Sequence, residues 1–368
     1  MKILKIAILT STLFVGACSH STPAQQPSDT AATAPTATLY NRLFELRTQG
    51  TMIGHQDAFA YGVGWYADDL RCDFRDATGV YPAIFGWEIG ELEIGAEYSL
   101  DSVNFDRLRE YIRRADAVGG INTISWHARN PLTGGDAWDV SSPQTVPSVL
   151  VGGDRHEAYL KGLDHLASLF LSLKDDRGTL IPVIFRPYHE MTGDWFWWGA
   201  PHTSAADYVA LWQMTADYLQ QKGVHNLLWA YSASGFTSDE EFLAYYPGDR
   251  YADLIGFDAY QQPDDVKGTV YQADVSRRID RLLALATTHH KIPILAETGY
   301  ETIPDSTWFS RVLNPLLEGR GLSYVLLWRN AYNRPNHFYA AYPGHAAAAD
   351  MQQFTARCDI LTADKIKQ

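Results

Sequence analysis

The sequence predicts an α/β fold, a single (β/α)8 TIM barrel domain, and three observations lead to it. Short apolar runs alternate with amphipathic, helix-like stretches along the chain, and eight such units fit within its 368 residues. The apolar runs lack strict polar alternation, which is typical of parallel strands buried on both faces. The absence of any internal linker or solenoid repeat favours one large barrel over two domains.

The chain begins with a segment that has the pattern of a secretory signal. Lys2 and Lys5 precede an apolar stretch over 6–17, which is shorter than the ~20 residues that a membrane-spanning helix needs. The stretch ends in VGAC at 15–18, which resembles a bacterial lipobox, where cleavage exposes a cysteine that then receives lipid. We therefore expect a lipoprotein signal peptide over 1–17 and lipid attachment at Cys18. A plain secretory signal that ends in cysteine is the alternative.

Residues 18–38 are rich in Ser, Thr, Pro, Ala and Gln. Such a segment buries too little apolar surface to fold alone, so we expect a flexible, lipid-anchored linker. Ser19 after the lipidated cysteine is compatible with an outer membrane lipoprotein facing either the periplasm or the cell surface. The expected partition is a barrel over 39–361 and a tail over 362–368. The expected protein is a monomer that touches the membrane only through its anchor.

The predicted elements follow in order. The apolar, strand-like runs span 51–54, 81–87, 121–126, 180–185, 226–231, 253–257, 293–295 and 323–328. Amphipathic, helix-like stretches lie between or after them, over 105–118, 156–173, 205–222, 275–290, 307–317 and 346–358.

Polar and aromatic side chains follow five of these runs, where a barrel gathers its functional residues. The carboxyl ends of barrel strands meet at one mouth, so these side chains should lie together. They occur in Trp126-His127, in Arg186-Pro187-Tyr188-His189-Glu190, in Asp258-Ala259-Tyr260, in Glu297-Thr298-Gly299 and in Trp328-Arg329-Asn330.

Glu190 and Glu297 are the strongest candidates for chemistry. A carboxylate directly after an apolar strand loses hydration, which is costly unless it is hydrogen bonded or functional. Two of them facing each other across a barrel mouth suit glycoside hydrolysis, in which one carboxyl group protonates the leaving oxygen and the other attacks or activates water. The alternative is ordinary salt bridges to Arg186 or Arg329.

Aromatic and histidine side chains accompany the pair. Four consecutive aromatics occupy 195–198, and because they cannot all point inward, at least one should be exposed to stack on a sugar ring. His127 and His189 fit either hydrogen-bonded spacers or ligand contacts, and the sequence leaves both open.

Composition and missing motifs exclude other classes of function. The 30 Lys and Arg against 43 Asp and Glu do not suit a polyanion surface, so nucleic acid is not an expected partner. No phosphate loop or convincing dinucleotide fingerprint occurs, and HEMTG at 189–193 lacks the second histidine of a zinc protease. Tyr231-Ser-Ala-Ser-Gly also lacks the first glycine of a nucleophile elbow. We therefore expect no metal or cofactor.

The residues now resemble glycoside hydrolase family 26, best known for β-mannanases. The central match is FRPYHEM at 185–191, with Trp195 five residues beyond Glu190. The likeness extends from Gly54-His55-Gln56 to Trp328-Arg329-Asn330. Many related barrel glycosidases have Asn before the acid/base, and His189 in that place is characteristic of this family.

The resemblance implies a retaining double displacement, with Glu190 as general acid/base and Glu297 as nucleophile. It implies that Tyr260 hydrogen bonds the nucleophile, that His189 orients the acid/base and that Trp195 stacks on the leaving-group sugar. The remaining residues implied to contact substrate are His127, Trp138, Asp258, Trp328 and Arg329.

The implied activity is that of an endo-β-1,4-mannanase on mannan, glucomannan or galactomannan. If the long loop over 88–104 folds across the non-reducing end of the cleft, the enzyme would instead release mannobiose from chain ends. The family also contains enzymes for β-1,3-xylan and mixed-linkage glucan. A surface glycan-binding protein without catalysis is the alternative of a different class. Whether Cys72 and Cys358 form a disulfide stays open.

Overall fold

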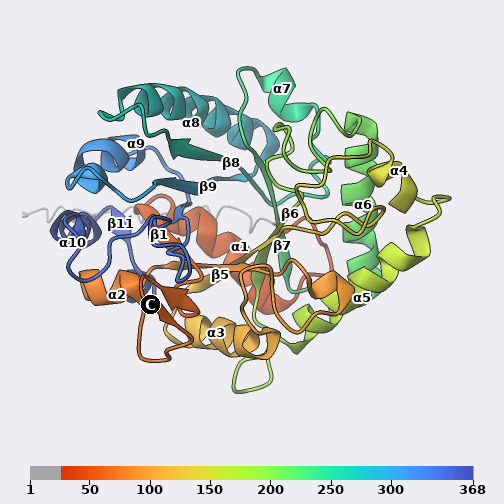
Figure 1. Cartoon of the computed structure of the whole chain (residues 1–368), viewed down its shortest axis with the longest axis horizontal. Helices are drawn as coiled ribbons and strands as arrows, with labels where there is room; N and C mark the ends of the chain where they lie inside the picture. Colours follow the sequence, from red (N-terminus) through yellow and green to blue (C-terminus); the bar gives the residue numbers. More distant parts are fainter. Residues whose placement is uncertain (1–25, 368) are drawn as a thin grey trace, which may run out of the picture.

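The computed structural model of the chain describes residues 26–367, and these form a closed parallel barrel surrounded by helices (Figure 1). Eight strands pair in the order β10-β9-β8-β7-β6-β5-β4-β1, and β10 pairs with β1 to close the barrel. The strands are β1 (Thr51–Gln56), β4 (Ile84–Glu88), β5 (Ile121–Trp126), β6 (Val183–Pro187), β7 (Leu227–Ala233), β8 (Leu254–Gln261), β9 (Ile292–Tyr300) and β10 (Tyr324–Leu327). Each predicted apolar run overlaps one of them, so the fold prediction is confirmed.

The long helices also lie where amphipathic stretches predicted them. They are α3 (Phe105–Ala117), α5 (His156–Ser172), α6 (Ala205–Gln221), α8 (Thr269–His289) and α10 (Ala348–Ala356). The stretch over 307–317 is a π-helical turn (Phe309–Leu313) that continues into α9 (Asn314–Leu317). Short elements were not predicted: α2 (Asp73–Thr78), β2 (Tyr61–Gly62), β3 (Trp65–Tyr66), η1 (Leu92–Ile94), α4 (Thr145–Val149), α7 (Asp239–Leu243) and β11 (Ile360–Leu361).

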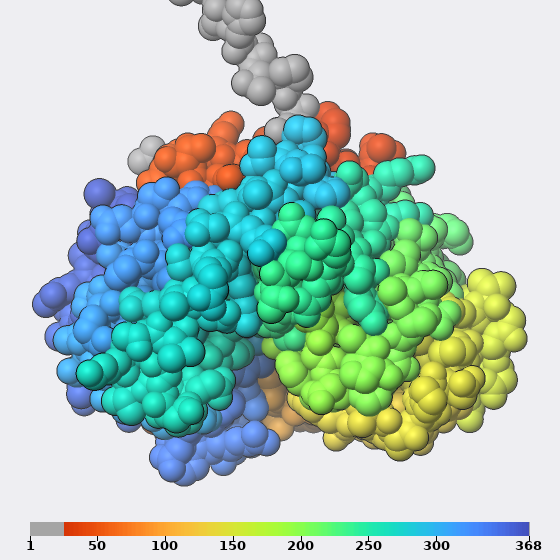
Figure 2. Space-filling view, turned by 90° about the horizontal axis from the view of Figure 1, so that it is seen from above, coloured from red at the N-terminus to blue at the C-terminus, as the bar shows by residue number. Residues whose placement is uncertain are grey.

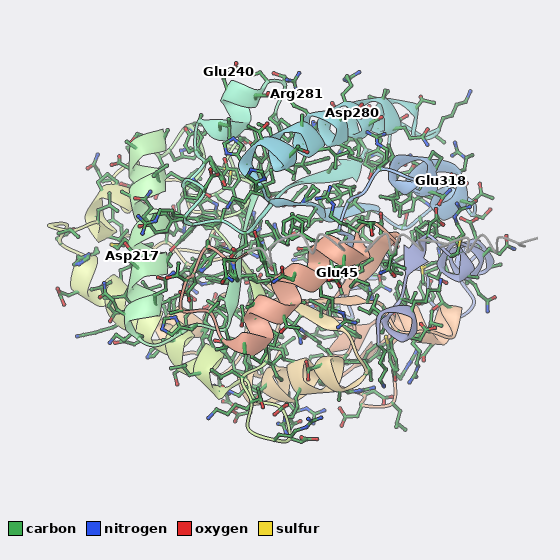
Figure 3. The ribbon with its side chains drawn as sticks, turned by 180° about the vertical axis from the view of Figure 1, so that it is seen from behind. Glu45, Asp217, Glu240, Asp280, Arg281 and Glu318 are labelled. Carbon is green, nitrogen blue, oxygen red and sulfur yellow. The ribbon has the colours of Figure 1, made fainter. Side chains whose placement is uncertain are left out.

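Helix α1 (Ala34–Leu46) closes the end of the barrel where the strands begin. Its buried Leu39 and Leu43 belong to the same apolar cluster as Met52, Ile184 and other side chains from the barrel interior. Figure 3 shows α1 crossing this end of the molecule, with Glu45 on it. Since one end is filled by α1, any opening into the barrel lies at the opposite end.

The structure differs from the predicted flexible linker over 18–38, because its second half is folded onto the barrel. The Ser28 amide donates to Asp253 at 2.6 Å, and the Thr33 amide donates to the His225 carbonyl at 2.8 Å. Thr33 caps α1, which starts five residues before the predicted boundary. The segment was predicted to be a flexible linker because its residues are small and polar, yet it is held by hydrogen bonds to residues late in the chain. Residues 1–25, with the predicted signal peptide and Cys18, lie outside the described residues.

The predicted tail over 362–368 also differs, since most of it packs on the domain. Strand β11 pairs with β1, and α11 (Ala363–Ile366) follows it with Ile366 buried. The two cysteines of the barrel domain do not pair: Cys72 is buried, Cys358 is exposed, and both are free thiols. No helix among residues 26–367 has the length and apolar character to cross a bilayer.

Candidate active site

The turn after β6 aims Glu190 into the barrel mouth. Tyr188 and Glu190 adopt left-handed backbone conformations, with φ of 46° and 58°, which residues other than glycine rarely adopt. Two hydrogen bonds hold the turn: the Glu190 amide donates to the Ser232 carbonyl at 2.8 Å, and the Tyr208 hydroxyl donates to the Tyr188 carbonyl at 2.8 Å. Such strained residues persist only where the surroundings fix them, and they cluster at functional sites.

An irregularity between β8 and β9 brings Asp258 and Glu297 to the same face. Phe257 pairs with Leu295, but the next pair is Asp258 with Glu297, so Ala296 is the extra residue of a bulge. Bulges re-aim side chains and are frequent beside active sites. Here the bulge places Glu297 opposite Asp258 at the carboxyl ends of neighbouring strands.

Arg186 lies beside both carboxyl groups and contacts each of them. Its guanidinium is buried, donates to Asp258 Oδ2 at 2.9 Å and forms an ion pair with Glu297. The Tyr260 hydroxyl donates to the other oxygen of Glu297 at 2.6 Å. Glu297 therefore has a cation on one carboxyl oxygen and a hydroxyl donor on the other.

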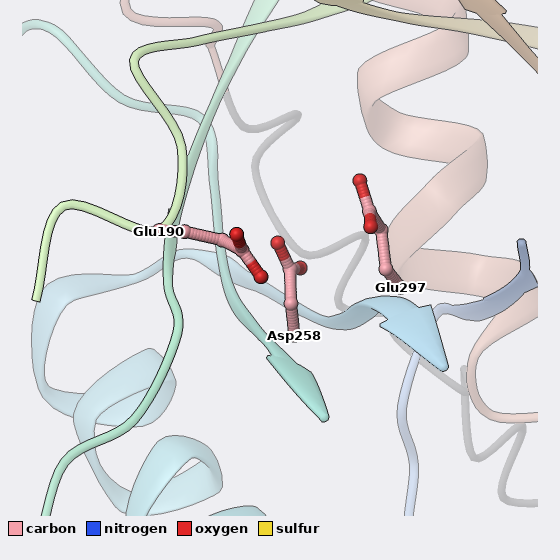
Figure 4. Close-up of side chains that lie close together, drawn as sticks. All are labelled: Glu190, Asp258 and Glu297. Carbon is pink, nitrogen blue, oxygen red and sulfur yellow. The ribbon is translucent and has the colours of Figure 1, made fainter. Parts of the chain in front are cut away.

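Glu190 lies beside this pair (Figure 4). One carboxyl oxygen from each of Glu190, Asp258 and Glu297 lies within 4.8 Å of those of the other two. Retaining glycosidases hold their two carboxyl groups about 5–5.5 Å apart, whereas inverting ones need about 6.5–9.5 Å. The spacing of Glu190 and Glu297 therefore suits direct attack by a carboxylate.

Glu190 has the proton affinity of an acid catalyst. Burial and the nearby negative charge of Glu297 raise the pKa of Glu190 to about 7. Trp195 opposes part of this shift, because its indole Nε1 donates to Glu190 Oε2 at 2.8 Å. Glu190 and Glu297 thus differ in role through their surroundings: one carboxyl group holds a proton, and the other faces a guanidinium and a phenol.

The same three carboxyl groups form the one cluster, within the described part of the chain, whose ligand atoms lie close enough for a metal ion. Arg186 already contacts two of these groups. Its positive charge occupies the place that a cation would take between Asp258 and Glu297.

His127 and His189 form a buried chain with Glu88. His127 Nδ1 lies 2.7 Å from Glu88 Oε2, and His127 Nε2 lies 3.2 Å from His189 Nε2. Burial acts to lower the pKa of His127, but the Glu88 carboxylate outweighs it and the pKa is raised. Burial, with the charges of Arg186 and His127, holds the pKa of His189 well below its ordinary value. His189 is therefore a neutral imidazole behind Glu190.

The contacts among Glu88, His127 and His189 bear on the roles that the family resemblance implies for the two histidines. Both ring nitrogens of His127 face protein partners, so its expected contact with a sugar through a ring nitrogen stays a prediction. No hydrogen bond joins the His189 ring to the Glu190 side chain within the described residues. His189 instead packs against Phe196 and Trp198, and its Nδ1 has no partner. Glu88 was not predicted as a site residue, although it is the last residue of the apolar strand β4 and so lies at a strand end, as Glu190 lies after the end of β6.

Aromatic side chains flank the carboxyl groups on both sides. Of the four consecutive aromatics, Trp195 is 38% exposed, and Phe196, Trp197 and Trp198 are buried. The prediction that at least one of these rings is exposed is confirmed. Trp138 is 45% exposed and stacks on His127, with ring centroids 5.3 Å apart. Trp328 lies edge-to-face with His127. The expected sugar contacts of Trp138, Trp195 and Trp328 stay predictions that their exposure permits.

Arg329, after β10, is tied to the long loop that follows β4. Its Nη1 lies 2.6 Å from Asp101 Oδ1 and 3.4 Å from the Tyr61 hydroxyl. Asp101 is nearly buried, so the loop reaches across β1 to meet the end of β10. Asp101 was not predicted, because nothing in its local sequence links it to a residue 228 positions away.

Comparison with known proteins agrees with this geometry. The model for glycosyl hydrolase family 26 matches residues 28–311. A mannan endo-1,4-beta-mannosidase of Bifidobacterium adolescentis is 34% identical over 359 residues, which are 92% of this chain and 35% of that enzyme. The chain thus spans about a third of the length of that relative. A mannan endo-1,4-beta-mannosidase of Bacillus subtilis strain 168 is 32% identical over 279 residues, or 70% of this chain and 69% of that enzyme.

Solved structures give the same result. A family 26 beta-mannanase from Bacteroides ovatus superposes with a TM-score of 0.87 and 44% identity, covering 90% of this chain and 96% of that one. An endo-beta-1,4-mannanase catalytic domain from a Bacillus species gives 0.85 at 28% identity, covering 93% and 95%. Because the family model covers most of the chain and the barrel carries both carboxyl groups at its mouth, the protein belongs to glycosyl hydrolase family 26.

Proposed function

We propose that the protein is a retaining β-mannanase that hydrolyses β-1,4-mannosidic bonds in mannan, glucomannan or galactomannan. The observation that carries the proposal is the spacing of Glu190 and Glu297, whose nearest oxygens lie within 4.8 Å, together with the pKa of about 7 for Glu190. The substrate class is supported by the relatives named as mannanases.

In the first step Glu297 attacks the anomeric carbon while Glu190 gives its proton to the leaving oxygen. The bond from the anomeric carbon to that oxygen breaks, and an ester bond to Glu297 forms. Tyr260 and Arg186 hold Glu297 in place before attack through the contacts described above. The proton of Glu190 leaves with the departing sugar.

In the second step Glu190 acts as a base. The ester carries no charge, so the part of the raised pKa of Glu190 that came from the charge of Glu297, in addition to burial, disappears and the Glu190 carboxylate takes a proton from water. The hydroxide attacks the anomeric carbon, the ester breaks, and Glu297 regains its charge. Two inversions give net retention.

Removing either carboxyl group separates an enzyme from a glycan-binding protein. We expect Glu297→Ala to lower kcat on galactomannan by at least a thousandfold, because no nucleophile remains. Glu190→Ala should do the same on mannan. With a dinitrophenyl β-mannobioside, whose leaving group needs no proton, the variant should keep the first step, seen as a burst of released chromophore, and lose steady turnover because the second step lacks its base. Release of reducing sugar measures cleavage of the polysaccharides, and release of the chromophore measures cleavage of the dinitrophenyl β-mannobioside.

The matched control is Glu240→Ala, which removes an exposed carboxylate on α7 (Figure 3). It should leave both rates unchanged. If wild-type protein bound mannan but cleaved neither substrate, the non-catalytic alternative would replace the proposal.

The raised pKa of Glu190 predicts how activity and stability depend on pH. Since Glu190 must be protonated at the start, kcat/KM on mannotetraose should fall as pH rises through about 7. In the unfolded chain the group has a pKa of about 4.3, so the folded state binds the extra proton between pH ~4 and ~7 and loses stability as pH rises through that range.

Glu190→Gln removes this titration. We therefore expect the variant to gain stability over wild type on going from pH 4 to pH 8, measured as the free energy of unfolding in urea at both values. An unchanged difference between the two proteins would contradict the raised pKa.

A second candidate action, release of mannobiose from chain ends, is favoured by the loop over 89–104. Its Asp101 meets Arg329 at the end of β10, on the side of the mouth with Trp328. A loop in that place can block further sugars at the non-reducing end, whereas the relatives named endo-mannosidases favour internal cutting.

Mass spectrometry of early products from mannohexaose and galactomannan separates the two actions, using residues 26–368. We expect a spread of oligosaccharide sizes from an internal-cutting enzyme. If mannobiose alone forms and Asp101→Ala broadens the products, the loop closes the cleft and the action is from chain ends. No products from either substrate would direct the search to β-1,3-xylan or mixed-linkage glucan.

We further propose that the mature protein is a monomer anchored by lipid at Cys18 in a bacterial outer membrane. The support is the sequence pattern: the charged start, the short apolar stretch and VGAC at 15–18. Full-length chain expressed with labelled palmitate should carry the label, and Cys18→Ser should not. Label on both would place the lipid elsewhere.

A further inference from the structure

A cavity of about 630 Å³ opens beside the catalytic carboxyl groups. Glu190 and Trp195 line it, but Glu297 does not. Because Glu190 gives its proton to the leaving oxygen, the leaving part of a substrate lies on the side that this cavity occupies. Its volume is within the range of about 300–1,000 Å³ that is usual for ligand pockets.

The cavity extends from Trp195 along the first turns of α8. Val270, Asp274 and Arg278 all line it, and residues four apart lie on the same face of a helix. From 270 to 278 the helix rises about 12 Å, at ~1.5 Å per residue. This wall is longer than one pyranose ring. Figure 2 shows the surface hollowed between the turquoise atoms that lead into α8 and the light-green atoms that follow β6.

The Arg278 guanidinium is held in place at this wall. Its Nη1 donates to the Ser234 carbonyl at 3.0 Å, its Nη2 lies 2.5 Å from Asp274 Oδ2, and it lies over the ring of Phe257. Gly235 leaves room for it, since a Cβ there would lie 3.3 Å from Nη1. A guanidinium fixed from three sides loses little freedom when a ligand binds.

Asp274 keeps capacity to accept further hydrogen bonds. Its side chain is 38% exposed, and its second oxygen has only a long contact of 3.5 Å with Arg277. A carboxylate offers about four acceptor sites, so Asp274 can take sugar hydroxyls while it stays paired with Arg278. The exposed Val270 lies one turn away on the same wall and offers apolar surface to a ring face.

We propose that Asp274 and Arg278 form a second leaving-group subsite, which binds the hexopyranose unit next but one to the cleaved bond. Asp274 accepts hydrogen bonds from hydroxyls of that sugar, and Arg278 keeps the carboxylate charged and oriented. The inference rests on the proposed mannanase function. It predicts that Asp274 and Arg278 raise kcat/KM for substrates that place two sugar units on the leaving side, and that they do not change kcat/KM for substrates that place one group there.

The test compares two substrates with the same glycone. Mannotetraose cleaved at its centre places two units on the leaving side, whereas an aryl β-mannobioside places only its aryl group there. We expect Asp274→Ala and Arg278→Met each to lower kcat/KM on mannotetraose about tenfold, equivalent to about 1.4 kcal/mol, and to leave the aryl mannobioside unchanged.

Arg277→Ala is the control, because Arg277 is 73% exposed, neighbours the same carboxylate and does not line the cavity. It should change neither rate. Asp274 is on the helix surface, so Asp274→Ala carries the test even if Arg278→Met fails to fold. Equal losses on both substrates, or no loss on mannotetraose, would overturn the subsite. A wild-type protein that cleaves neither substrate would instead overturn the mannanase proposal.

Discussion

The buried positive charge of Arg186 is the condition on which the site depends. Two carboxylates, Asp258 and Glu297, lie beside it at the ends of adjacent strands, with almost no access to water. A buried carboxylate needs a partner for its charge, and the guanidinium contacts both of these groups. Burial still raises the pKa of Asp258 well above its ordinary value, and Arg186 opposes that shift. A protonated Glu297 is no nucleophile. Arg186, within β6, therefore supplies the cation that Glu297 faces.

The same ion pair explains why Glu190 differs from Glu297. The guanidinium contacts Asp258 and Glu297 but does not reach Glu190, whose side-chain partner is the indole of Trp195. Burial and the negative charge of Glu297 raise the pKa of Glu190 to about 7, so Glu190 holds its proton to a higher pH than an ordinary carboxyl group does. The two glutamates differ because the guanidinium contacts Glu297 and Asp258 directly, whereas the side chain of Glu190 is hydrogen bonded to Trp195.

The strand ends could be predicted from sequence, because apolar runs and their first polar neighbours are local features. Glu190 and Glu297 were found in this way, and both lie at the mouth. The bulge at Ala296, which aligns Glu297 with Asp258, could not be predicted. A shift of one residue in the pairing of β9 with β8 leaves the apolar sequence of β9 the same. Only pairing with β8 determines that register.

Contacts between segments that are distant in the sequence could not be predicted either. Glu88 meets His127 across neighbouring strands, and Asp101 meets Arg329 across β1, and neither contact has a signal in local spacing. Residues 26–38 were misjudged for a related reason. Their hydrogen-bond partners, His225 and Asp253, come late in the chain, so composition alone made the segment look unable to fold.

The described chain enters the barrel at the end opposite the active site. The first described residues contact Asp253 and His225, which precede β8 and β7, and then α1 covers the same end. In Figure 2 these red residues lie at one margin of the molecule. The carboxyl groups lie at the opposite ends of the strands. The described chain therefore enters the barrel at its closed end, and a polymer that approaches the open mouth meets neither α1 nor the residues before it.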